Sequence, residues 1–214
     1  NWSSFRLNND STEYFKVCLR SNEKNINIVA ASAPQMGMVA ATNLTSKMIN
    51  NFRPKYVAMS GIAGGIKGVG NFGDILVADS VFDSGSGKIS TDKDNQKIFL
   101  PDYRQIDIDS DLKEMILSIK GNREFLDDIK SKWPIKSINH QLDLHIGPFA
   151  SGAGVIANSE ALSDIKNHAR KLIGIDMEAY GVYYASKNCS KPRPKGVISL
   201  KSISDFGDIN KSDD

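Results

Sequence analysis

Short runs of β-branched and aromatic residues alternate along the chain with stretches whose apolar residues recur at helical spacing. Tyr14–Leu19 and Asn27–Ala31 flank a polar segment, which predicts a β-hairpin. The next stretch has no proline before Pro54, and its apolar residues predict one face of a helix: Ala41, Leu44, Met48 and Phe52. Two apolar strands follow, over Lys55–Ser60 and Asp74–Val81.

The same alternation returns after Leu142. The pattern predicts a strand over Ile146–Ala150, a helix that begins near Ser159, a short strand over Lys171–Ile175 and a strand over Gly196–Ile203. Between the last two strands, a helix that begins at Asp176-Met177-Glu178 is expected, with Ala179, Val182, Tyr183 and Ser186 on one face. Strands that alternate with helices are typical of an α/β sheet.

The domain organisation follows from length and from one change in polarity. A chain of 214 residues is long enough for one well-packed core, so residues 1–214 are predicted to form a single domain. Residues 83–141 are more polar, and we interpret them as a variable excursion with at least one helix. The chain opens on Asn1 and closes on Asp213-Asp214 just after a promising motif, so we expect it to be truncated at both ends.

Charge and composition exclude several classes of function. The net charge is +2, and lysines are scattered among aspartates, so nucleic acid and membrane surfaces are not expected partners. No apolar run reaches about 18 residues. Cys18 and Cys189 lie far apart without metal spacing, which suits a reducing compartment, and a cytoplasmic location is expected. His140, His145 and His168 form no metal-binding pattern.

Three segments follow predicted strands at the position where ligands collect in open α/β sheets: Gly61–Gly65, Asp176–Glu178 and Ser204-Asp205. Each also has a structural explanation. The glycines suit a tight turn, Glu178 suits a helix start, and Ser204-Asp205 suits the opening of a turn. The glycine segment lacks the context of a Rossmann or Walker motif, which argues against nicotinamide enzymes and nucleoside triphosphatases.

The carboxylates of Glu178 and Asp205 also have a specific functional interpretation. Both oxygens of an ionised Glu178 can accept hydrogen bonds from the vicinal hydroxyls of a ribose. Desolvation at the mouth of a buried strand can keep the Asp205 carboxyl protonated, which is what a departing purine requires. Lys201 lies on the strand that leads to Asp205 and could face the site, although a lysine in a strand is usually solvated.

Together the segments resemble the nucleoside phosphorylase superfamily, and most closely its methylthioadenosine/S-adenosylhomocysteine nucleosidase branch. The resemblance is carried by Met36–Ala41, Ser60–Gly65 with Gly73–Val77, Ser151-Gly152, Asp176–Ala179 and Ile203–Asp205 with Asp208. It implies a three-layer αβα fold with a central mixed, twisted β-sheet. It also implies a purine nucleoside or nucleotide as substrate, no metal, no organic cofactor, and a homodimer or a part of a larger multidomain protein.

The resemblance assigns roles residue by residue. Asp205 would protonate N7 of the purine, Ser204 would orient Asp205, and Glu178 with Met177 would bind the ribose. The backbone of Val155 would meet the base, and the other substrate-binding residues implied are Met36, Gly61, Ile62, Ala63 and Ser151. As the glycosidic bond stretches, the ribose becomes an oxocarbenium-like cation that Glu178 stabilises.

The departures from the family pattern leave three hypotheses. This chain has Met59 and Ile62 where the phosphorylases place a phosphate-binding arginine and serine, so water is the expected nucleophile. The leading hypothesis is therefore an N-glycoside hydrolase, and the alternative enzyme is a phosphate-dependent purine nucleoside phosphorylase. The chain also lacks the usual amino-terminal glutamate and has Val155 in place of an aromatic residue, which motivates a third hypothesis, a nucleoside-sensing domain without catalysis.

Overall fold

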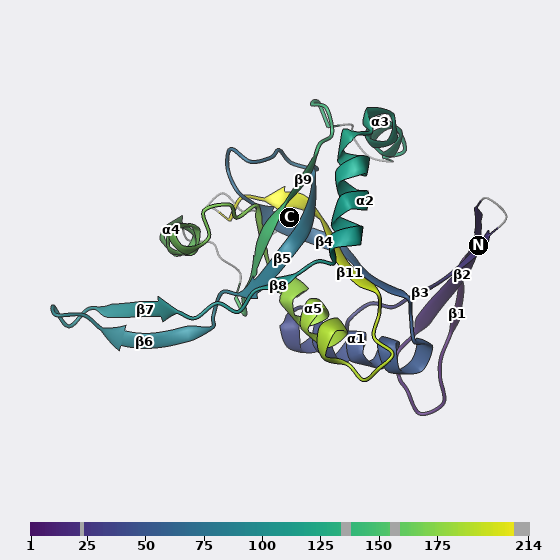
Figure 1. The fold of residues 1–214 in the computed structure, drawn as a ribbon, viewed down its shortest axis with the longest axis horizontal. Coiled ribbons are helices and arrows are strands. Elements are labelled where there is room, and N and C mark those ends of the chain that lie inside the picture. Colours follow the sequence, from purple (N-terminus) through teal and green to yellow (C-terminus); the bar gives the residue numbers. More distant parts are fainter. Residues whose placement is uncertain (22–23, 134–137, 155–158, 208–214) are drawn as a thin grey trace. The chain divides into compact units, whose positions relative to one another are not determined.

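The computed structural model describes residues 1–21, 24–133, 138–154 and 159–207, and within the helix that begins at Ser159 it leaves out the side chains of residues 159–162 and 164. Figure 1 shows the ribbon of the chain. Two compact units are present, Asn1–Met36 and Gly37–Asp214, and each is described by itself. The single-domain prediction for residues 1–214 stays a prediction.

The first unit is a three-stranded antiparallel sheet in the order β1-β2-β3. Its strands are β1 (Ser3–Phe5), β2 (Tyr14–Ser21) and β3 (Lys24–Ala30). The predicted hairpin is confirmed, since β2 and β3 pair from Phe15 opposite Ala30 to Ser21 opposite Lys24. Tyr14 is fully buried, and its hydroxyl donates a hydrogen bond of 2.6 Å to Oδ2 of Asp10.

The second unit is built on a six-stranded mixed sheet in the order β11-β4-β10-β9-β5-β8. Its strands are β4 (Tyr56–Gly65), β5 (Ile75–Asp83), β8 (Ile106–Asp107), β9 (Leu144–Ser151), β10 (Gly174–Asp176) and β11 (Gly196–Asp205). Strand β11 runs parallel to β4 and also pairs antiparallel with β5, so five of the strands form a closed ring of pairings. The predicted α/β fold with a mixed central sheet is confirmed.

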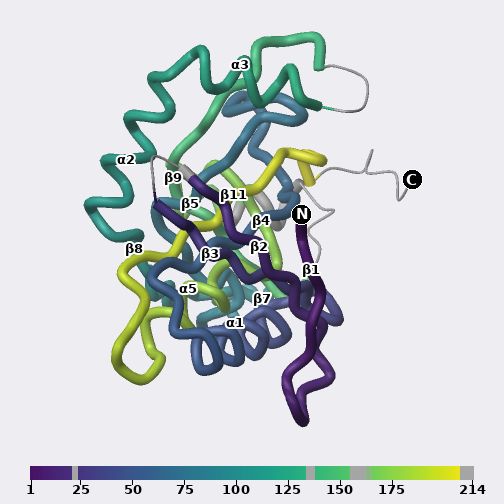
Figure 2. Tube along the Cα trace, turned by 90° about the vertical axis from the view of Figure 1, so that its right-hand side faces the viewer, coloured from purple at the N-terminus to yellow at the C-terminus, as the bar shows by residue number. Residues whose placement is uncertain are grey.

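Helices pack on more than one side of this sheet. They are α1 (Met38–Phe52), α2 (Ser110–Gly121), α3 (Arg123–Ser131), α4 (Ser159–His168) and α5 (Ala179–Asn188). Figure 1 and Figure 2 both show α1 and α5 side by side. The buried face of α5 includes the four predicted residues Ala179, Val182, Tyr183 and Ser186.

Successive side chains of a sheet strand point to opposite faces, so they pack in two different apolar clusters. Leu76 and Ala78 of β5 pack in the cluster that contains Val182 and Tyr183 of α5. Val77, which lies between them in β5, packs instead with Ile116 of α2 and Leu126 of α3. The sheet is therefore covered by α5 on one side and by α2 and α3 on the other.

The excursion over residues 83–141 contains more structure than its polarity indicates. It holds a hairpin of β6 (Gly87–Thr91) and β7 (Lys97–Pro101), followed by β8, α2 and α3. The amphipathic pattern from Leu112 to Ile129 is divided between two helices. Asn122 separates them, because its side chain accepts a hydrogen bond of 3.1 Å from the Phe125 amide and caps α3.

Two local predictions are wrong. The residues Gly61–Gly65 belong to β4 itself and form no turn after it. At Gly65 a Cβ atom would lie 2.9 Å from two atoms of Ile203, so the glycine lets β11 approach closely. Asp176 ends β10, and Glu178 occupies the position before the first residue of α5, so that helix begins later than its sequence pattern indicates.

Candidate active site

The carboxyl ends of three parallel strands meet at one edge of the sheet. Asp83 at the end of β5 lies opposite Ser151 at the end of β9, and Ser151 lies opposite Asp176 at the end of β10. The register of these pairings places the start of α5, including Glu178, directly beyond the same edge. The sheet therefore brings the segments at Ser151 and at Asp176–Glu178 together, as the sequence predicts.

Ser151 joins two of these segments. It is fully buried, and its hydroxyl donates a hydrogen bond of 2.7 Å to Oδ1 of Asp176. The hydroxyl oxygen of Ser151 in turn accepts a hydrogen bond of 2.9 Å from the Tyr180 amide in the first turn of α5. Because both of these contacts are internal, the hydroxyl of Ser151 orients Asp176 and the helix start.

A buried lysine links β11 to this edge. The side chain of Lys201 is 2% exposed, and its Nζ atom lies 3.1 Å from Oδ2 of Asp176 and 3.1 Å from Oε2 of Glu178. The expectation that a strand lysine is solvated is wrong here. Gly61 of β4 lies beside it, since a Cβ at that position would be in van der Waals contact with the Lys201 side chain at 3.5 Å from Nζ.

The other oxygen of Glu178 is held by the backbone of α1. The Gly37 amide donates a hydrogen bond of 3.0 Å to Oε1 of Glu178. Gly37 has φ 107°, a conformation that favours glycine, and it precedes the first residue of α1. The helices α1 and α5 pack closely at Gly181, where a Cβ would lie 2.5 Å from the Met38 carbonyl oxygen. This close packing keeps Gly37 beside Glu178.

Asp205 lies at the end of β11, next to an irregularity in the pairing with β4. Its Oδ1 accepts a hydrogen bond of 2.9 Å from the Gly207 amide, and Ser204 Oγ lies 3.2 Å from its Oδ2. A Cβ at Gly64 would lie 3.2 Å from Oδ1 of Asp205 and 2.9 Å from Cγ1 of Ile175. The absent side chain of Gly64 therefore lets the end of β11 approach the end of β10.

The remaining predicted residues differ in their surroundings. Ile62 is 67% exposed and Ala63 is buried, both in β4. Met177 is half-buried between Asp176 and Glu178. Met36 is exposed and belongs to the first unit, and Val155 lies outside the described residues.

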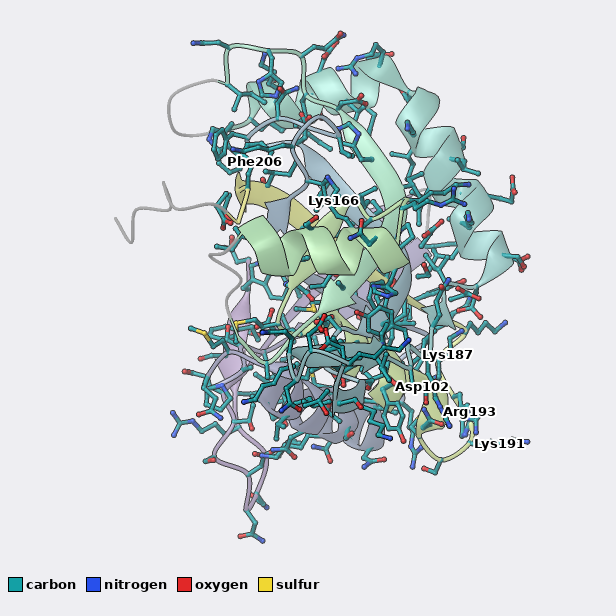
Figure 3. The ribbon with its side chains drawn as sticks, turned by 90° about the vertical axis from the view of Figure 1, so that its left-hand side faces the viewer. Asp102, Lys166, Lys187, Lys191, Arg193 and Phe206 are labelled. Atoms are coloured by element: carbon teal, nitrogen blue, oxygen red, sulfur yellow. The ribbon has the colours of Figure 1, made fainter. Side chains whose placement is uncertain are left out.

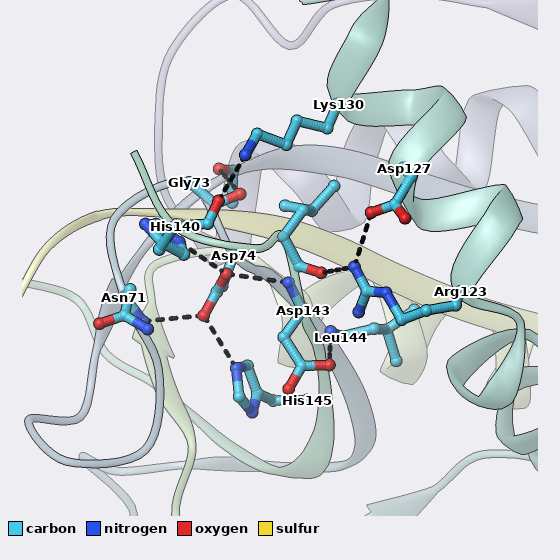
Figure 4. Close-up of polar contacts among 12 residues, drawn as sticks. Asn71, Gly73, Asp74, Arg123, Asp127, Lys130, His140, Asp143, Leu144 and His145 are labelled. Carbon is cyan, nitrogen blue, oxygen red and sulfur yellow. Dashed lines mark hydrogen bonds and ion pairs between the residues drawn. The ribbon is translucent and has the colours of Figure 1, made fainter. Parts of the chain in front are cut away.

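A second charged cluster contacts β11 two residues before Asp205, because the Ile203 amide donates to the Asp74 carbonyl oxygen. Figure 4 shows the buried carboxylate of Asp74 between two imidazoles. Nε2 of His140 lies 3.1 Å from Oδ1, and Nε2 of His145 lies 3.1 Å from Oδ2. The Asp143 amide also donates to Oδ1 and the Asn71 amide to Oδ2.

The electrostatics of Asp74 are set by these contacts. Burial by itself would raise its pKa, but the hydrogen bonds from Asn71, His145, Asp143 and His140 outweigh burial and lower the pKa below the ordinary value for an aspartate. Asp74 is therefore ionised at neutral pH, and its carboxylate holds the loops around it together.

The sequence interpretation missed part of the site. Asp176 and Gly37 received no role of their own, although both contact the Glu178–Lys201 group. One signal was available, since Lys201 lies four residues before Asp205 in a strand whose other residues are mostly apolar. Among the described residues, no group of three or more His, Cys, Asp or Glu side chains is arranged to hold a metal ion. No helix in the described part of the chain is both long and apolar enough to cross a membrane.

Comparison with known proteins identifies the family to which the chain is related. The family model of the phosphorylase superfamily matches residues 7–214. An uncharacterised protein of Sinorhizobium fredii, y4jS, is 30% identical over 98% of this chain and 50% of its own length. The ATP nucleosidase Cap17 of Escherichia coli is 25% identical over 97% of this chain and 42% of its own length. This chain thus spans about half the length of these curated relatives.

The solved structures agree on the fold. A 5′-methylthioadenosine/S-adenosylhomocysteine nucleosidase of Helicobacter pylori superposes with a TM-score of 0.69 at 21% identity, over 98% of this chain and 77% of the other. At this level of identity the likeness establishes the α/β fold.

Proposed function

We propose an activity for this chain on one premise: the chain belongs to the phosphorylase superfamily. The proposed activity is hydrolysis of the bond between base and ribose in a purine nucleoside or nucleotide. One observation carries the proposal. The Gly37 amide and Lys201 hold Glu178 just beyond the end of β10, and Gly64 lets Asp205 approach Ile175 of the same strand.

Glu178 is the proposed ribose ligand because its carboxylate is oriented and still has room to accept. Each of its oxygens receives one hydrogen bond from the described residues, from Gly37 at Oε1 and from Lys201 at Oε2. A carboxylate oxygen has about two lone-pair sites, so each oxygen of Glu178 can accept one more hydrogen bond. The two vicinal hydroxyls of a ribose match these two free positions.

The charge of the group suits the transition state. Asp176 and Glu178 carry two negative charges around the single positive charge of Lys201, so the cluster has a formal charge of −1. A fixed negative charge in a site with little water stabilises a cation that develops in the transition state. The oxocarbenium-like ribose is such a cation.

Asp205 is the proposed general acid. In this proposal it donates a proton to N7 of the purine, so that the base departs as a neutral molecule. Ser204 and the Gly207 amide, which contact the two carboxyl oxygens, orient it. Met177, Gly61, Ile62, Ala63 and Ser151 remain proposed substrate-binding residues, and so do Met36 and Val155.

Water is the proposed nucleophile. A phosphorylase needs a cationic or hydroxyl side chain beside the reacting carbon to hold phosphate. The residues at the corresponding positions of β4 are Met59 and Ile62, and neither side chain can donate a hydrogen bond.

The first test is chromatographic detection of free base after incubation with adenosine, methylthioadenosine, AMP and ATP, each with and without phosphate. Base release that does not depend on phosphate supports the hydrolase. Release only with phosphate supports the phosphorylase, and binding without any release supports the nucleoside sensor.

Asp205→Asn tests the acid in the same assay. We expect turnover to fall by about two to four orders of magnitude, the range typical for a general acid. Asp107→Asn, in the exposed edge strand β8, is the matched control and should keep its activity. Full turnover in Asp205→Asn would overturn the assignment of the acid.

Homodimer formation and a cytoplasmic location are further parts of the proposal. The β6–β7 hairpin exposes Ile89, Phe99 and Leu100, and an isolated two-stranded hairpin is marginally stable in water. A second copy of the chain would cover these side chains. Light scattering on wild type and on Ile89→Asp tests this, since the variant should be shifted toward the monomer.

A further inference from the structure

A cavity of about 410 Å³ lies between the base of the β6–β7 hairpin and the first turn of α5. Its lining residues are Ser86, Gly87, Lys88, Leu100, Asp102, Arg104 and Tyr180. Figure 3 views the molecule from the side on which the hairpin projects, with Asp102 of the cavity wall labelled. The volume is within the range of about 300–1,000 Å³ found for small-molecule sites.

The cavity walls are linked to the candidate active site through the start of α5 and through hydrogen bonds. Tyr180 is two residues after Glu178, and its amide is bound to the buried hydroxyl of Ser151. On the opposite wall, Ser86 donates a hydrogen bond of 3.0 Å to Asp83 at the end of β5. The neighbouring Ser84 hydroxyl donates to the Ser151 carbonyl oxygen. Both walls are thus tied to the strand ends that position Glu178.

The lining has an excess of positive charge. Lys88 and Arg104 contribute two cations, and Asp102 is the one carboxylate among the lining residues. Neither Lys88 nor Arg104 forms an ion pair with another of the described residues. Their charges are therefore available to an anionic ligand.

Tyr180 adds a neutral donor. Burial, with a smaller contribution from Asp83, raises the pKa of the Tyr180 hydroxyl above the ordinary value for a tyrosine. The hydroxyl therefore stays protonated at neutral pH, and it can donate a hydrogen bond to an anion.

Gly87 keeps the cavity open at the hairpin base. A Cβ at this position would lie 2.5 Å from the Leu100 carbonyl oxygen and 2.5 Å from Cζ of Phe99. The Phe99 ring therefore packs directly over Gly87, and no side chain projects between the two strands there.

We infer that this cavity binds the phosphate groups of a nucleoside 5′-phosphate whose ribose is held by Glu178. The inference rests on the proposed function and narrows its substrate to nucleotides. Two unpaired cations and a protonated phenol are donors that match phosphate oxygens.

The test compares kcat/KM for ATP, AMP and adenosine in wild type, Arg104→Ala and Lys88→Ala. For Arg104→Ala we expect kcat/KM for ATP to fall about 10- to 100-fold, mainly through KM, because one charge-assisted contact is lost. Lys88 offers a single ammonium in place of the planar fork of donors of Arg104, so Lys88→Ala should cost about 3- to 10-fold. Adenosine cleavage should change less than about 3-fold, since adenosine carries no phosphate.

Lys97→Ala is the matched control, because Lys97 lies in β7 of the same hairpin and is not among the lining residues. Equal losses for ATP and adenosine in Arg104→Ala, or losses no larger than those of Lys97→Ala, would overturn the inference. Wild-type cleavage of adenosine with no cleavage of AMP or ATP would also overturn it, while the hydrolase proposal would stand.

A binding measurement separates the inference from the proposed function. Calorimetric titration of Asp205→Asn with ATP should detect binding that weakens about 10- to 100-fold when Arg104→Ala is added to the same chain. If no base is released from any substrate but this Arg104-dependent binding remains, the hydrolase proposal fails and the phosphate site stands. If Asp205→Asn binds ATP no more tightly than adenosine, the phosphate site is refuted.

Discussion

Two charged clusters contact β11 near its carboxyl end, and they use their carboxylates in opposite ways. In the first, Lys201 is shared by Asp176 and Glu178, and each oxygen of Glu178 receives one hydrogen bond from the described residues. In the second, the single carboxylate of Asp74 receives four contacts, two at each oxygen. Glu178 can therefore accept hydrogen bonds from a ligand, whereas the acceptor capacity of Asp74 is used by the protein itself.

The difference distinguishes a candidate binding site, the Lys201 cluster, from a structural cluster around Asp74. In the Lys201 cluster two carboxylates share one ammonium, so the cluster has a formal charge of −1. In the Asp74 cluster two imidazoles and two backbone amides of the protein occupy the one carboxylate. Changes in the first cluster should therefore affect catalysis, and changes in the second should affect mainly stability.

The largest effect is expected from Lys201→Met. This change leaves two buried carboxylates without their cation, and breaking such a pair costs about 3–5 kcal/mol in the free energy of unfolding. Denaturant unfolding measures the loss, and base release should fall with it. Lys195→Met, at an exposed lysine just before β11, is the control and should be nearly neutral. Stability equal to that of the control would mean that Lys201 does not pair with these acids in solution.

Glu178→Gln should affect catalysis more than stability. The amide keeps the shape of the side chain and an oxygen for the Gly37 amide, but it removes the negative charge that faces the cation. We expect kcat to fall about 100- to 1,000-fold, the loss typical for one oriented electrostatic group. A change in KM alone would contradict the proposed role in the transition state.

Asp74→Asn tests the structural role of the second cluster. The hydrogen bonds to Asp74 lower its pKa in the folded state. The ionised carboxylate therefore stabilises the folded state at any pH above its pKa in the unfolded chain, about 3.9. This stabilisation is lost as the pH falls through the lower pKa of the folded state. Asp74→Asn should therefore reduce the free energy of unfolding at pH 7 by about 1–3 kcal/mol. The difference from wild type should shrink below about pH 4. Unfolding at a series of pH values measures it, and a difference independent of pH would refute this account.

The Gly61–Gly65 segment shows where local sequence signals are ambiguous. Glycines after an apolar run indicate a turn, yet here they extend β4. Ile203 and Asp205 of the neighbouring β11 occupy the space that side chains at Gly65 and Gly64 would need. A contact between residues about 140 positions apart leaves no local signal. The burial of Lys201 was missed for the same reason, since its acceptors Asp176 and Glu178 come from another strand end.

Local pattern alone determined the type and order of most elements, because the periods of strands and helices are properties of consecutive residues. It also singled out Glu178 and Asp205 as candidates, because ligands collect where strands end. Only the tertiary structure decided that β11 pairs with both β4 and β5, that Lys201 is buried between two carboxylates, and that Lys88 and Arg104 share a cavity with Tyr180. These features depend on strand order and on side chains that meet across the fold, and such long-range contacts have no period along the chain.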